Sequence, residues 1–495
     1  MSTQGSLFDS PPQSNGDAET SDRYAGAMVF SAIGDALGWP TEFLKEESNR
    51  KVSFDLPVRE FVGWHKMVGG RWWGYRDFIA PGHYSDDTQL TLAIARSISS
   101  KGEFQPETFA YSELPLWLHY ERGGGRSIKA AARALVQKKN DWLGNFYKVG
   151  PIDYRQAGAN GAAMRNLPIA LASSQNETRL IRDSFYNAVI THGHPRAILG
   201  TLLYGLAVRY ALLEKIIKPE PMTEYLLDST SRVGRLLADD QRVHEWVATW
   251  ESKGKATKGS FKESFNKTHD EARQYLQGIQ AYLNRPTKDY YGFIGARKPE
   301  TKGSGLGTVC AAIYQFIRPK DRPEEQLYDA VNSLGTDTDT IAAFLGALLG
   351  AHHGLRAIPH HLSRKIQDRQ YLQKIGRWLH AVGTNKIVDE RESKLPLDRT
   401  EALMNLLAWE IGLHEMFWDA IDVGGIVVHP ALGRGEITNK DVRPIARAGY
   451  VIKLIQIAFD CGQTCTFHSR VEENGKIAES LGEVVQSSLS PAQRN

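Results

Sequence analysis

Apolar residues recur at intervals of three or four along most of the chain, the spacing that buries one face of a helix. Residues 21–38, 194–213 and 307–317 carry this pattern, and they are rich in the glycine and alanine residues that let helices approach closely. Alternation of polar and apolar residues, the mark of half-buried strands, is rare. The pattern predicts an all-α protein.

Two of the predicted helices begin with acidic clusters. The first, "SDDT" at residues 85–88, runs directly into the apolar pattern "QLTLAIARSI". The second, "TDTDT" at residues 336–340, precedes residues 341–351, which are Ile, Ala, Phe, Leu and Gly on every side. A helix that is apolar all round is surrounded by protein, so we expect its acidic start to be buried as well.

The clusters have two interpretations. Ser85 is a good N-cap and acids in a first turn complement the helix dipole, so each cluster resembles an ordinary helix start. Buried carboxylates, however, need a partner, and neither cluster contains Lys or Arg. Asp carboxylates and Ser or Thr hydroxyls are hard oxygen ligands that suit Mg²⁺, Mn²⁺ or Ca²⁺. Together the two clusters could clamp a pair of divalent ions.

Composition limits the class of protein. The 495 residues, 41% of them hydrophobic, are enough for two to three domains with a real core. Lys plus Arg number 60 against 57 for Asp plus Glu, so a net charge of +3 gives no general signal for nucleic acid or anionic membrane. With three cysteines, no recognisable secretion signal and no bilayer-spanning apolar run, we expect a soluble, cytoplasmic protein.

The N-terminal residues 1–20 are polar and offer little to bury, which predicts a disordered tail. Within it, "QGSLFD" resembles the short peptides by which bacterial proteins hold the replication sliding clamp. Gln4, Leu7 and Phe8 are therefore the predicted contacts for a possible clamp partner.

Two other regions stand out. The aromatic and glycine-rich residues 61–84 read as a long loop, placed to form a wall or lid over the first acidic cluster. Residues 381–495 change character: 398–421 and 442–462 read as amphipathic helices joined by a turn-rich connection. This predicts a C-terminal helical accessory unit of unknown function.

Four blocks carry a resemblance to a known family. They are "GDALGWPTE" (34–42), "SDDT" (85–88), "NGAAMRNLPIAL" (160–171) and "GTDTDTIAAFLGALLGAHHG" (335–354). In this order they resemble the ADP-ribosylglycohydrolases, typified by the dinitrogenase reductase-activating glycohydrolase. The resemblance implies an all-α catalytic domain over residues 21–380 with a centre of two Mg²⁺ (or Mn²⁺) ions.

The resemblance also implies roles for individual residues. Asp35 would be an acid behind the ions, and Glu42 the flexible acid beside the ions and substrate; these two are the implied catalytic residues. The implied metal ligands are Ser85, Asp86, Asp87, Asp337, Asp339 and Thr340.

A turn at residues 160–165 is the implied substrate contact. Small residues there let backbone N–H groups approach a diphosphate; alternatively, the turn simply leads into a helix with Met164 in the core. His192 is implied to bind ribose or phosphate, although a lone histidine can equally be a structural hydrogen bonder. The full implied set is Asn160, Gly161, Ala162, Met164, Arg165 and His192.

The resulting expectation is a hydrolase that removes ADP-ribose from a modified macromolecule by cleaving an N- or O-glycosidic bond at the distal ribose. The acceptor is open: an arginine or serine side chain, or nucleic acid. Ala159 and Thr336 stand where the family commonly has Gly, and Ser85 where it has Thr. The two glycine departures motivate a first alternative, a non-catalytic ADP-ribose-binding module. A metal-dependent nucleotide phosphohydrolase is the second.

Overall fold

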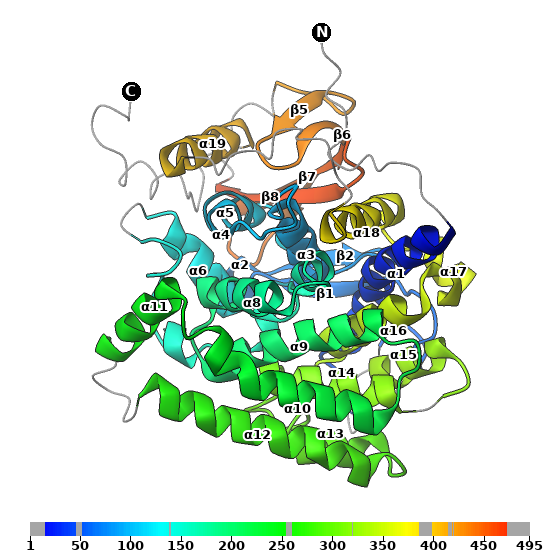
Figure 1. Cartoon of the computed structure of the whole chain (residues 1–495). Coiled ribbons are helices and arrows are strands. Elements are labelled where there is room, and N and C mark those ends of the chain that lie inside the picture. The colour runs from blue at the N-terminus through cyan, green and yellow to red at the C-terminus, as the bar shows by residue number, and fades with distance from the viewer. Residues whose placement is uncertain are drawn as a thin grey trace.

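The computed structural model of the chain describes residues 15–45, 52–137, 140–253, 260–318, 320–385, 398–413, 418 and 420–472. Helices make up most of this part of the chain (Figure 1), so the predicted helical fold is confirmed. The helices are α1 (Asn15–Gly38), α2 (Gly70–Trp73), α3 (Asp86–Arg96), α4 (Pro106–Thr108), α5 (Leu114–Trp117), α6 (Arg126–Leu135), α7 (Leu167–Ala172), α8 (Glu177–Thr191), α9 (Pro195–Leu213), α10 (Pro219–Leu236), α11 (Gln241–Ser252), α12 (Phe261–Tyr282), α13 (Thr287–Phe293), α14 (Gly305–Ile317), α15 (Pro323–Val331), α16 (Thr338–His353), α17 (His360–Ser363), α18 (Arg369–Gly383) and α19 (Arg399–Ile411). The strands are β1 (Trp64–Val68), β2 (Tyr75–Ile79), β3 (Lys148–Val149), β4 (Ile152–Asp153), β5 (Ile426–His429), β6 (Gly433–Pro444), β7 (Tyr450–Phe459) and β8 (Thr464–Glu472).

Helices α1 and α16 pack backbone to backbone in the core. A Cβ atom on Gly34 would lie 2.1 Å from the carbonyl oxygen of Ala342, and one on Gly346 would lie 2.2 Å from that of Phe30. Neither position has room for a side chain, so these glycines are required for the close approach that the sequence predicted. The packing sets the end of α1, which carries Asp35, beside the acidic start of α16.

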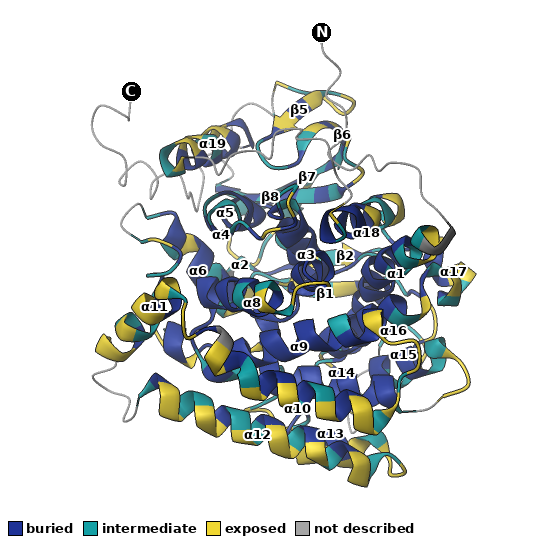
Figure 2. Cartoon of the chain, viewed as in Figure 1, coloured by how far each residue is buried: buried dark blue, intermediate teal, exposed yellow. Residues whose placement is uncertain are grey.

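The central helices are buried on nearly every side, as the dark blue ribbons in Figure 2 show. Helix α9 is the one helix of the described residues that is long and apolar enough to span a membrane. Of its most apolar 18-residue window, 83% is buried inside the protein, which is the environment of a core helix.

The predicted loop at residues 61–84 is wrong in part, because it contains an antiparallel hairpin. Strands β1 and β2 pair with Trp64 opposite Ile79. Both side chains bury against Trp39, whose ring meets that of Trp64 edge-on at 5.4 Å. Trp39 is the first residue of the 3₁₀ turn η1 (Trp39–Thr41), which leads to Glu42. The hairpin packs on this residue and so forms a wall beside the first acidic cluster.

The predicted helical accessory unit at the C-terminus is also wrong. Helix α19 is shorter than the expected 398–421, and the predicted helix at 442–462 is instead β7 with parts of its neighbours, in an antiparallel sheet ordered β5-β6-β7-β8. The apolar residues of β7 occur both at alternate positions and in adjacent pairs, so they fit either period. The β-branched residues and the flanking glycines favour a strand.

The sheet is attached to the helical body by buried polar contacts. The backbone N–H of His468 donates to His119 O at 2.9 Å, and that of Thr464 donates to the Asp368 carboxylate at 3.1 Å. Arg96 of α3 donates to the Gln463 side chain at 2.7 Å. The sheet therefore packs against the same helix, α3, whose first turn carries the first acidic cluster.

The predicted disordered tail is corrected at its end, because α1 begins at Asn15 rather than after residue 20. Asp17 in its first turn complements the helix dipole and lies 3.5 Å from the His380 ring of α18. The clamp-like residues Gln4, Leu7 and Phe8 lie outside the described residues.

Candidate active site

The first acidic cluster is a capped helix start, but Asp86 and Asp87 are not its caps. Ser85 Oγ accepts from the backbone N–H of Asp87 at 3.2 Å. The buried Asp35 carboxylate accepts from the backbone of Ser85 and from both the N–H and the hydroxyl of Thr88, the last at 2.6 Å. Ser85 and Asp35 thus accept the hydrogen bonds of the backbone N–H groups at the start of α3. The carboxylates of Asp86 and Asp87 are not needed as caps and remain for another partner.

The second cluster meets Glu42 at the start of α16. Thr41 and Thr338 share a hydrogen bond of 2.9 Å, which joins the η1 turn to this helix start. One carboxylate oxygen from each of Glu42, Asp337 and Asp339 lies within 4.8 Å of the others, a group that can hold a metal ion. The acidic clusters at the starts of α3 and α16 are about 250 residues apart in sequence, and Glu42, at the end of η1, lies beside both.

Burial dominates the electrostatics of these acids. Burial raises the pKa of Asp87 well above its usual range, and repulsion from Asp35 and Asp86 raises it further. Burial likewise raises the pKa of Asp339, and repulsion from Glu42 raises it further. Burial raises the pKa of Glu42 to about 8 and that of Asp86 to about 7. The pKa values of Asp35 and Asp337 are raised by burial too.

The donor set fits a bound cation. The Thr340 hydroxyl bonds to the Asp87 carboxylate. Among the described residues, however, no donor reaches Asp87 Oδ2, a buried oxygen. An unpartnered buried carboxylate oxygen among other carboxylates is destabilising unless a cation shares it. Only hard oxygen ligands converge here, which favours Mg²⁺ or Mn²⁺ over zinc.

The raised pKa values predict how the protein without divalent ions responds to pH. Because the folded pKa of Glu42 is about 8 against an ordinary 4.5, the folded state holds a proton that the unfolded chain releases, so its stability falls as pH rises through this window. Asp339→Asn removes one repelling charge. In chelator we expect its Tm to exceed that of the unaltered protein by a few degrees at most, at about 1 °C per kcal/mol for a chain of this length, with a larger difference at higher pH.

Calorimetric melting between pH 4.5 and 8 checks this expectation. Adding Mg²⁺ should stabilise the unaltered protein more than the variant. The matched control is Asp183→Asn, which removes a buried acid that is paired with Arg182 at 2.9 Å and so should lower Tm. An Asp339→Asn protein that melts lower than the unaltered chain at pH 8 in chelator would show that the carboxylates do not repel one another.

Two lysines near the acids are not evident from the sequence. Lys302 Nζ donates to the backbone carbonyl of Glu42, and Lys66 of β1 lies close enough to lower the pKa of Glu42 in opposition to its burial. Lys66 belongs to the predicted wall at residues 61–84 and Lys302 to a segment before the second cluster, but no local pattern marks either lysine as a site residue. Their charges offset the acids only in part, because burial remains the larger effect on Glu42 and Asp337.

The predicted phosphate turn lies against the second cluster. Asn160 begins the 3₁₀ turn η4 (Asn160–Ala162), and its side chain donates to Asp337 Oδ2 at 2.6 Å. A Cβ atom on Gly161 would lie 2.7 Å from Ile128 and 3.0 Å from His192, so packing also requires the glycine.

The remaining residues of the predicted substrate set face inward. Ala162 and Met164 are buried, and Arg165 is fully buried with its guanidinium donating to Gly161 O, Asn187 and Thr191. Arg165 therefore holds the turn from behind. Burial lowers the pKa of His192 to about 3, so this ring is neutral.

The departures at Ala159 and Thr336 do not strain the backbone. Ala159 has φ −73° and ψ 169°, an extended conformation that any residue adopts. The Thr336 hydroxyl donates to Ser333 O at 2.7 Å, and the left-handed position is taken by its neighbour, Gly335, with φ 83°. Neither departure disturbs the predicted turn or the second cluster.

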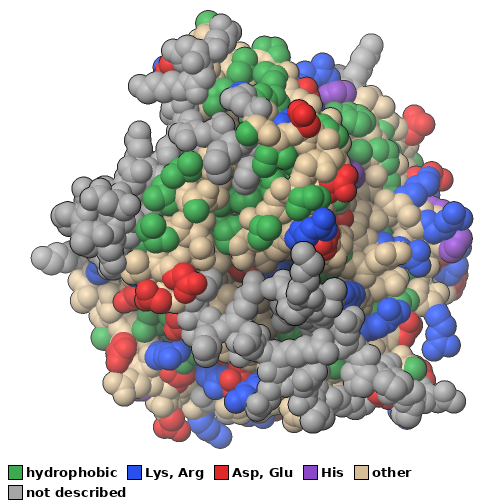
Figure 3. All heavy atoms as spheres, turned by 90° about the horizontal axis from the view of Figure 1, so that it is seen from above, with side chains coloured by type: hydrophobic (Ala, Val, Ile, Leu, Met, Phe, Trp, Pro, Cys, Tyr) green, Lys and Arg blue, Asp and Glu red, His purple; other side chains and the backbone are tan. Residues whose placement is uncertain are grey.

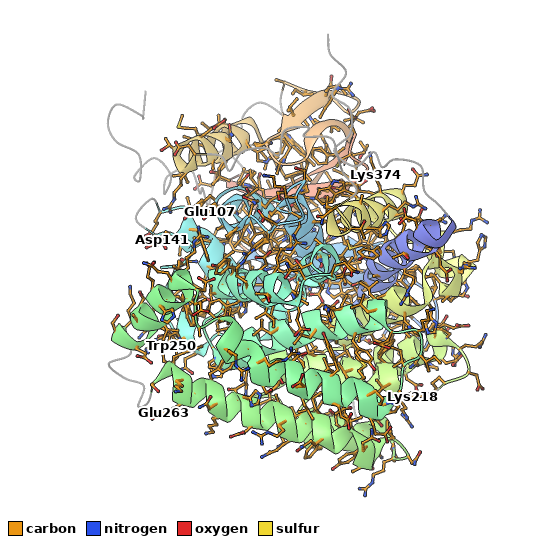
Figure 4. All side chains as sticks on the ribbon, in the orientation of Figure 1. Glu107, Asp141, Lys218, Trp250, Glu263 and Lys374 are labelled. Carbon is orange, nitrogen blue, oxygen red and sulfur yellow. The ribbon has the colours of Figure 1, made fainter. Side chains whose placement is uncertain are left out.

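The loop that carries His192 is held by α11. Trp250 of this helix, labelled in Figure 4, donates from its indole nitrogen to Gly193 O at 2.8 Å. Thr191 Oγ1 lies 2.7 Å from the Nδ1 atom of His192, which fixes the ring beneath the turn. Arg155 stacks over Trp250 at 5.4 Å and completes this support.

The helical fold carries a buried acidic centre that could hold a divalent cation. The family of the protein follows from comparison with known sequences: the model of the ADP-ribosylglycohydrolase family matches residues 16–387. The chain belongs to this family, which confirms the resemblance seen in the sequence and assigns it to the hydrolases that remove ADP-ribose.

Named relatives agree with this assignment. The ADP-ribosyl-[dinitrogen reductase] glycohydrolase of Rhodospirillum rubrum is 31% identical over 39% of this chain and 58% of that protein. ADP-ribosylhydrolase ARH3 of Danio rerio is 26% identical over 68% of this chain and 84% of its own length. ADP-ribosylarginine hydrolase Tri1 of Serratia proteamaculans is 22% identical over 75% of this chain and 82% of its own length.

A solved structure shares the fold. A chain of an "ADP-ribosylglycohydrolase-related protein complex" superposes with a TM-score of 0.50 at 24% identity, covering 74% of this chain and 99% of that one. The family match ends at residue 387, so α19 and the sheet β5–β8 lie outside it. These elements are an addition of this chain to the matched region.

Proposed function

We propose that the protein is a divalent-cation-dependent hydrolase that releases ADP-ribose from a modified macromolecule by cleaving the N- or O-glycosidic bond at the distal ribose. The observation that carries the proposal is the convergence of Glu42, Asp337 and Asp339 within 4.8 Å, beside a buried Asp87 oxygen without a donor among the described residues. Such a group is costly to bury unless it holds a cation.

Six residues would hold two Mg²⁺ or Mn²⁺ ions, which supply orientation of the ribose hydroxyls and a more acidic water. They are Ser85, Asp86, Asp87, Asp337, Asp339 and Thr340. Asp35 orients this set through its hydrogen bonds to Ser85 and Thr88, and Asn160 through its bond to Asp337.

In the reaction, a water oxygen forms a bond to the anomeric carbon while the glycosidic bond breaks, and its electron pair passes to the acceptor atom. Protons must leave the water and reach the acceptor. Glu42 is the residue we assign to this transfer, because it is a carboxylate at the edge of the acidic group, at the end of the η1 turn.

The diphosphate of ADP-ribose would lie on the η4 turn. The backbone N–H of Asn160 already donates to Gly303 O at 2.9 Å, so the diphosphate would meet the N–H groups that follow it. The buried Arg165 holds the turn by binding Gly161 O at 3.1 Å. Asn160 links this turn to Asp337, so the distal ribose would come to lie over the acids.

A panel of ADP-ribosylated substrates tests the proposal. Arginine-linked and serine-linked proteins, ADP-ribosylated oligonucleotides and nucleoside diphosphates are each incubated with Mg²⁺ or Mn²⁺ and analysed by mass spectrometry. We expect free ADP-ribose and an unmodified acceptor. ADP-ribose binding without turnover of any substrate would favour a non-catalytic ADP-ribose-binding module. Phosphate release from nucleotides would favour a metal-dependent nucleotide phosphohydrolase.

A further inference from the structure

The hairpin β1–β2 joins the acidic centre to the C-terminal sheet that lies outside the family match. At one end Lys66 stands over the buried Trp39 ring, 4.6 Å from its centroid. At the other end the backbone N–H of Ala446, in the β6–β7 connection, donates to Gly74 O at 2.9 Å. The hairpin therefore connects the acidic centre with the sheet.

Lys66 contributes a cation next to an exposed aromatic ring. Its ammonium group lies 5.3 Å from the ring centroid of Phe43, a side chain that is 52% exposed. Among the described residues its contacts are with rings rather than with a carboxylate at ion-pair distance. The ammonium group thus acts on the Asp86 and Glu42 carboxylates and also lies beside an exposed ring on which a planar group can stack.

The far end of the hairpin repeats this combination. The exposed Arg447 lies 4.7 Å from the ring of Trp73 and 4.5 Å from that of Tyr450, and Arg470 lies 5.8 Å from Trp73. Seen from above (Figure 3), the visible face mixes hydrophobic side chains with basic and acidic ones. We call Phe43, Lys66, Trp73, Arg447, Tyr450 and Arg470 the hairpin surface.

The hairpin surface lies on the acceptor side of the centre. The η4 turn meets the acids at Asp337, through Asn160. Lys66 meets them at Asp86: a Cβ atom on Gly123 would lie 2.8 Å from Asp86 Oδ1 and 3.1 Å from Lys66 Nζ. The η4 turn and Lys66 therefore approach the acids at different residues, and a diphosphate on the turn would leave the Lys66 side for the group attached to the distal ribose.

We propose that the hairpin surface binds the acceptor and that this acceptor is a single-stranded nucleic acid. The inference rests on the proposed function. Cations that track phosphates, alternating with aromatic rings on which bases stack, are the chemistry that recognises single strands without a sequence code. The net charge of the whole chain is only +3, so the attraction is local to this surface.

Binding of an unmodified, fluorescently labelled oligonucleotide to the full-length protein tests the inference separately from catalysis. We expect binding that weakens as salt rises. Lys66→Gln and Arg447→Gln should each reduce the slope of log affinity against log salt by about 0.7, the value for one phosphate contact on a single strand. Phe43→Ala should weaken binding roughly 5- to 100-fold through lost stacking.

The matched control is Lys218→Gln, which removes an exposed lysine before α10, on the far side of the molecule from the sheet (Figure 4). It should bind the oligonucleotide as the unaltered protein does. Unchanged melting temperatures exclude misfolding as the cause of weaker binding. Binding that is absent at low salt, or equally affected by Lys218→Gln and the hairpin variants, overturns the inference.

A turnover comparison separates this failure from failure of the proposed function. Equal amounts of an ADP-ribosylated oligonucleotide and an ADP-ribosylated protein are offered to the enzyme with Mg²⁺. Preferential release from the oligonucleotide supports the inference. Release from the protein alone contradicts it while leaving the hydrolase intact, and release from neither contradicts the proposed function itself.

Discussion

Asp87→Asn is expected to reduce ADP-ribose release by at least about 100-fold, since altering even the partners of metal ligands typically costs 10- to 100-fold. The substitution replaces a carboxylate, one of whose buried oxygens has no donor within the described part of the chain, by an amide that carries no charge. Its side chain keeps the same size, so the packing of α3 should survive. Initial rates with saturating Mg²⁺ and a chosen ADP-ribosylated substrate measure the effect.

The control for this prediction is again Asp183→Asn, a buried acid of α8 that is outside the acidic centre and bonded to the backbone N–H of Phe104 at 3.3 Å. It should lower stability but keep the rate per folded molecule. Asp87→Asn with near-normal turnover in the presence of chelator would contradict a cation at this position.

Glu42→Gln is expected to lower kcat by roughly 10²- to 10⁴-fold, the usual contribution of a positioned acid or base. Glutamine fills nearly the same space, but it does not exchange a proton. Because the variant keeps the η4 turn and the other acids, KM should change far less than kcat. Steady-state kinetics at several Mg²⁺ concentrations separate this effect from weakened cation binding.

Glu60→Gln serves as the matched control, since Glu60 is an exposed glutamate in the segment between η1 and β1. It should leave both kinetic constants unchanged. If Glu42→Gln instead raises KM and spares kcat, Glu42 binds substrate and the proton transfer must be assigned to another group.

The features that can be predicted from the sequence are those set by a short motif or by the residues of a closely packed helix. The acidic starts of α3 and α16 were visible because short motifs set the chemistry of a helix start. The burial of α16 followed from its apolar residues on every side, and glycines such as Gly34 and Gly346 do let α1 and α16 meet. The roles of the individual ligands rest on the resemblance and stay predictions.

The sequence was less informative where structure depends on distant partners. The approach of Lys66 and Lys302 to Glu42 is set by tertiary packing, which no local pattern encodes. The capping role of Asp35 at α3 is also a contact between separate helices, at 3.1 Å to the Ser85 N–H. Strand β7 was mistaken for a helix because a short apolar run fits either period, and its pairing with β6 and β8 decides the outcome.

Acids distant in sequence converge in this protein because they share divalent cations. Diffraction from crystals grown with Mn²⁺, recorded at the manganese absorption edge, tests whether they do. We expect anomalous peaks between the starts of α3 and α16, roughly 2.1 Å from oxygens of Asp87 and Asp339, by analogy with Mg²⁺. Crystals with no peak there, and with these two carboxylates apart and hydrogen-bonded to water, would contradict it.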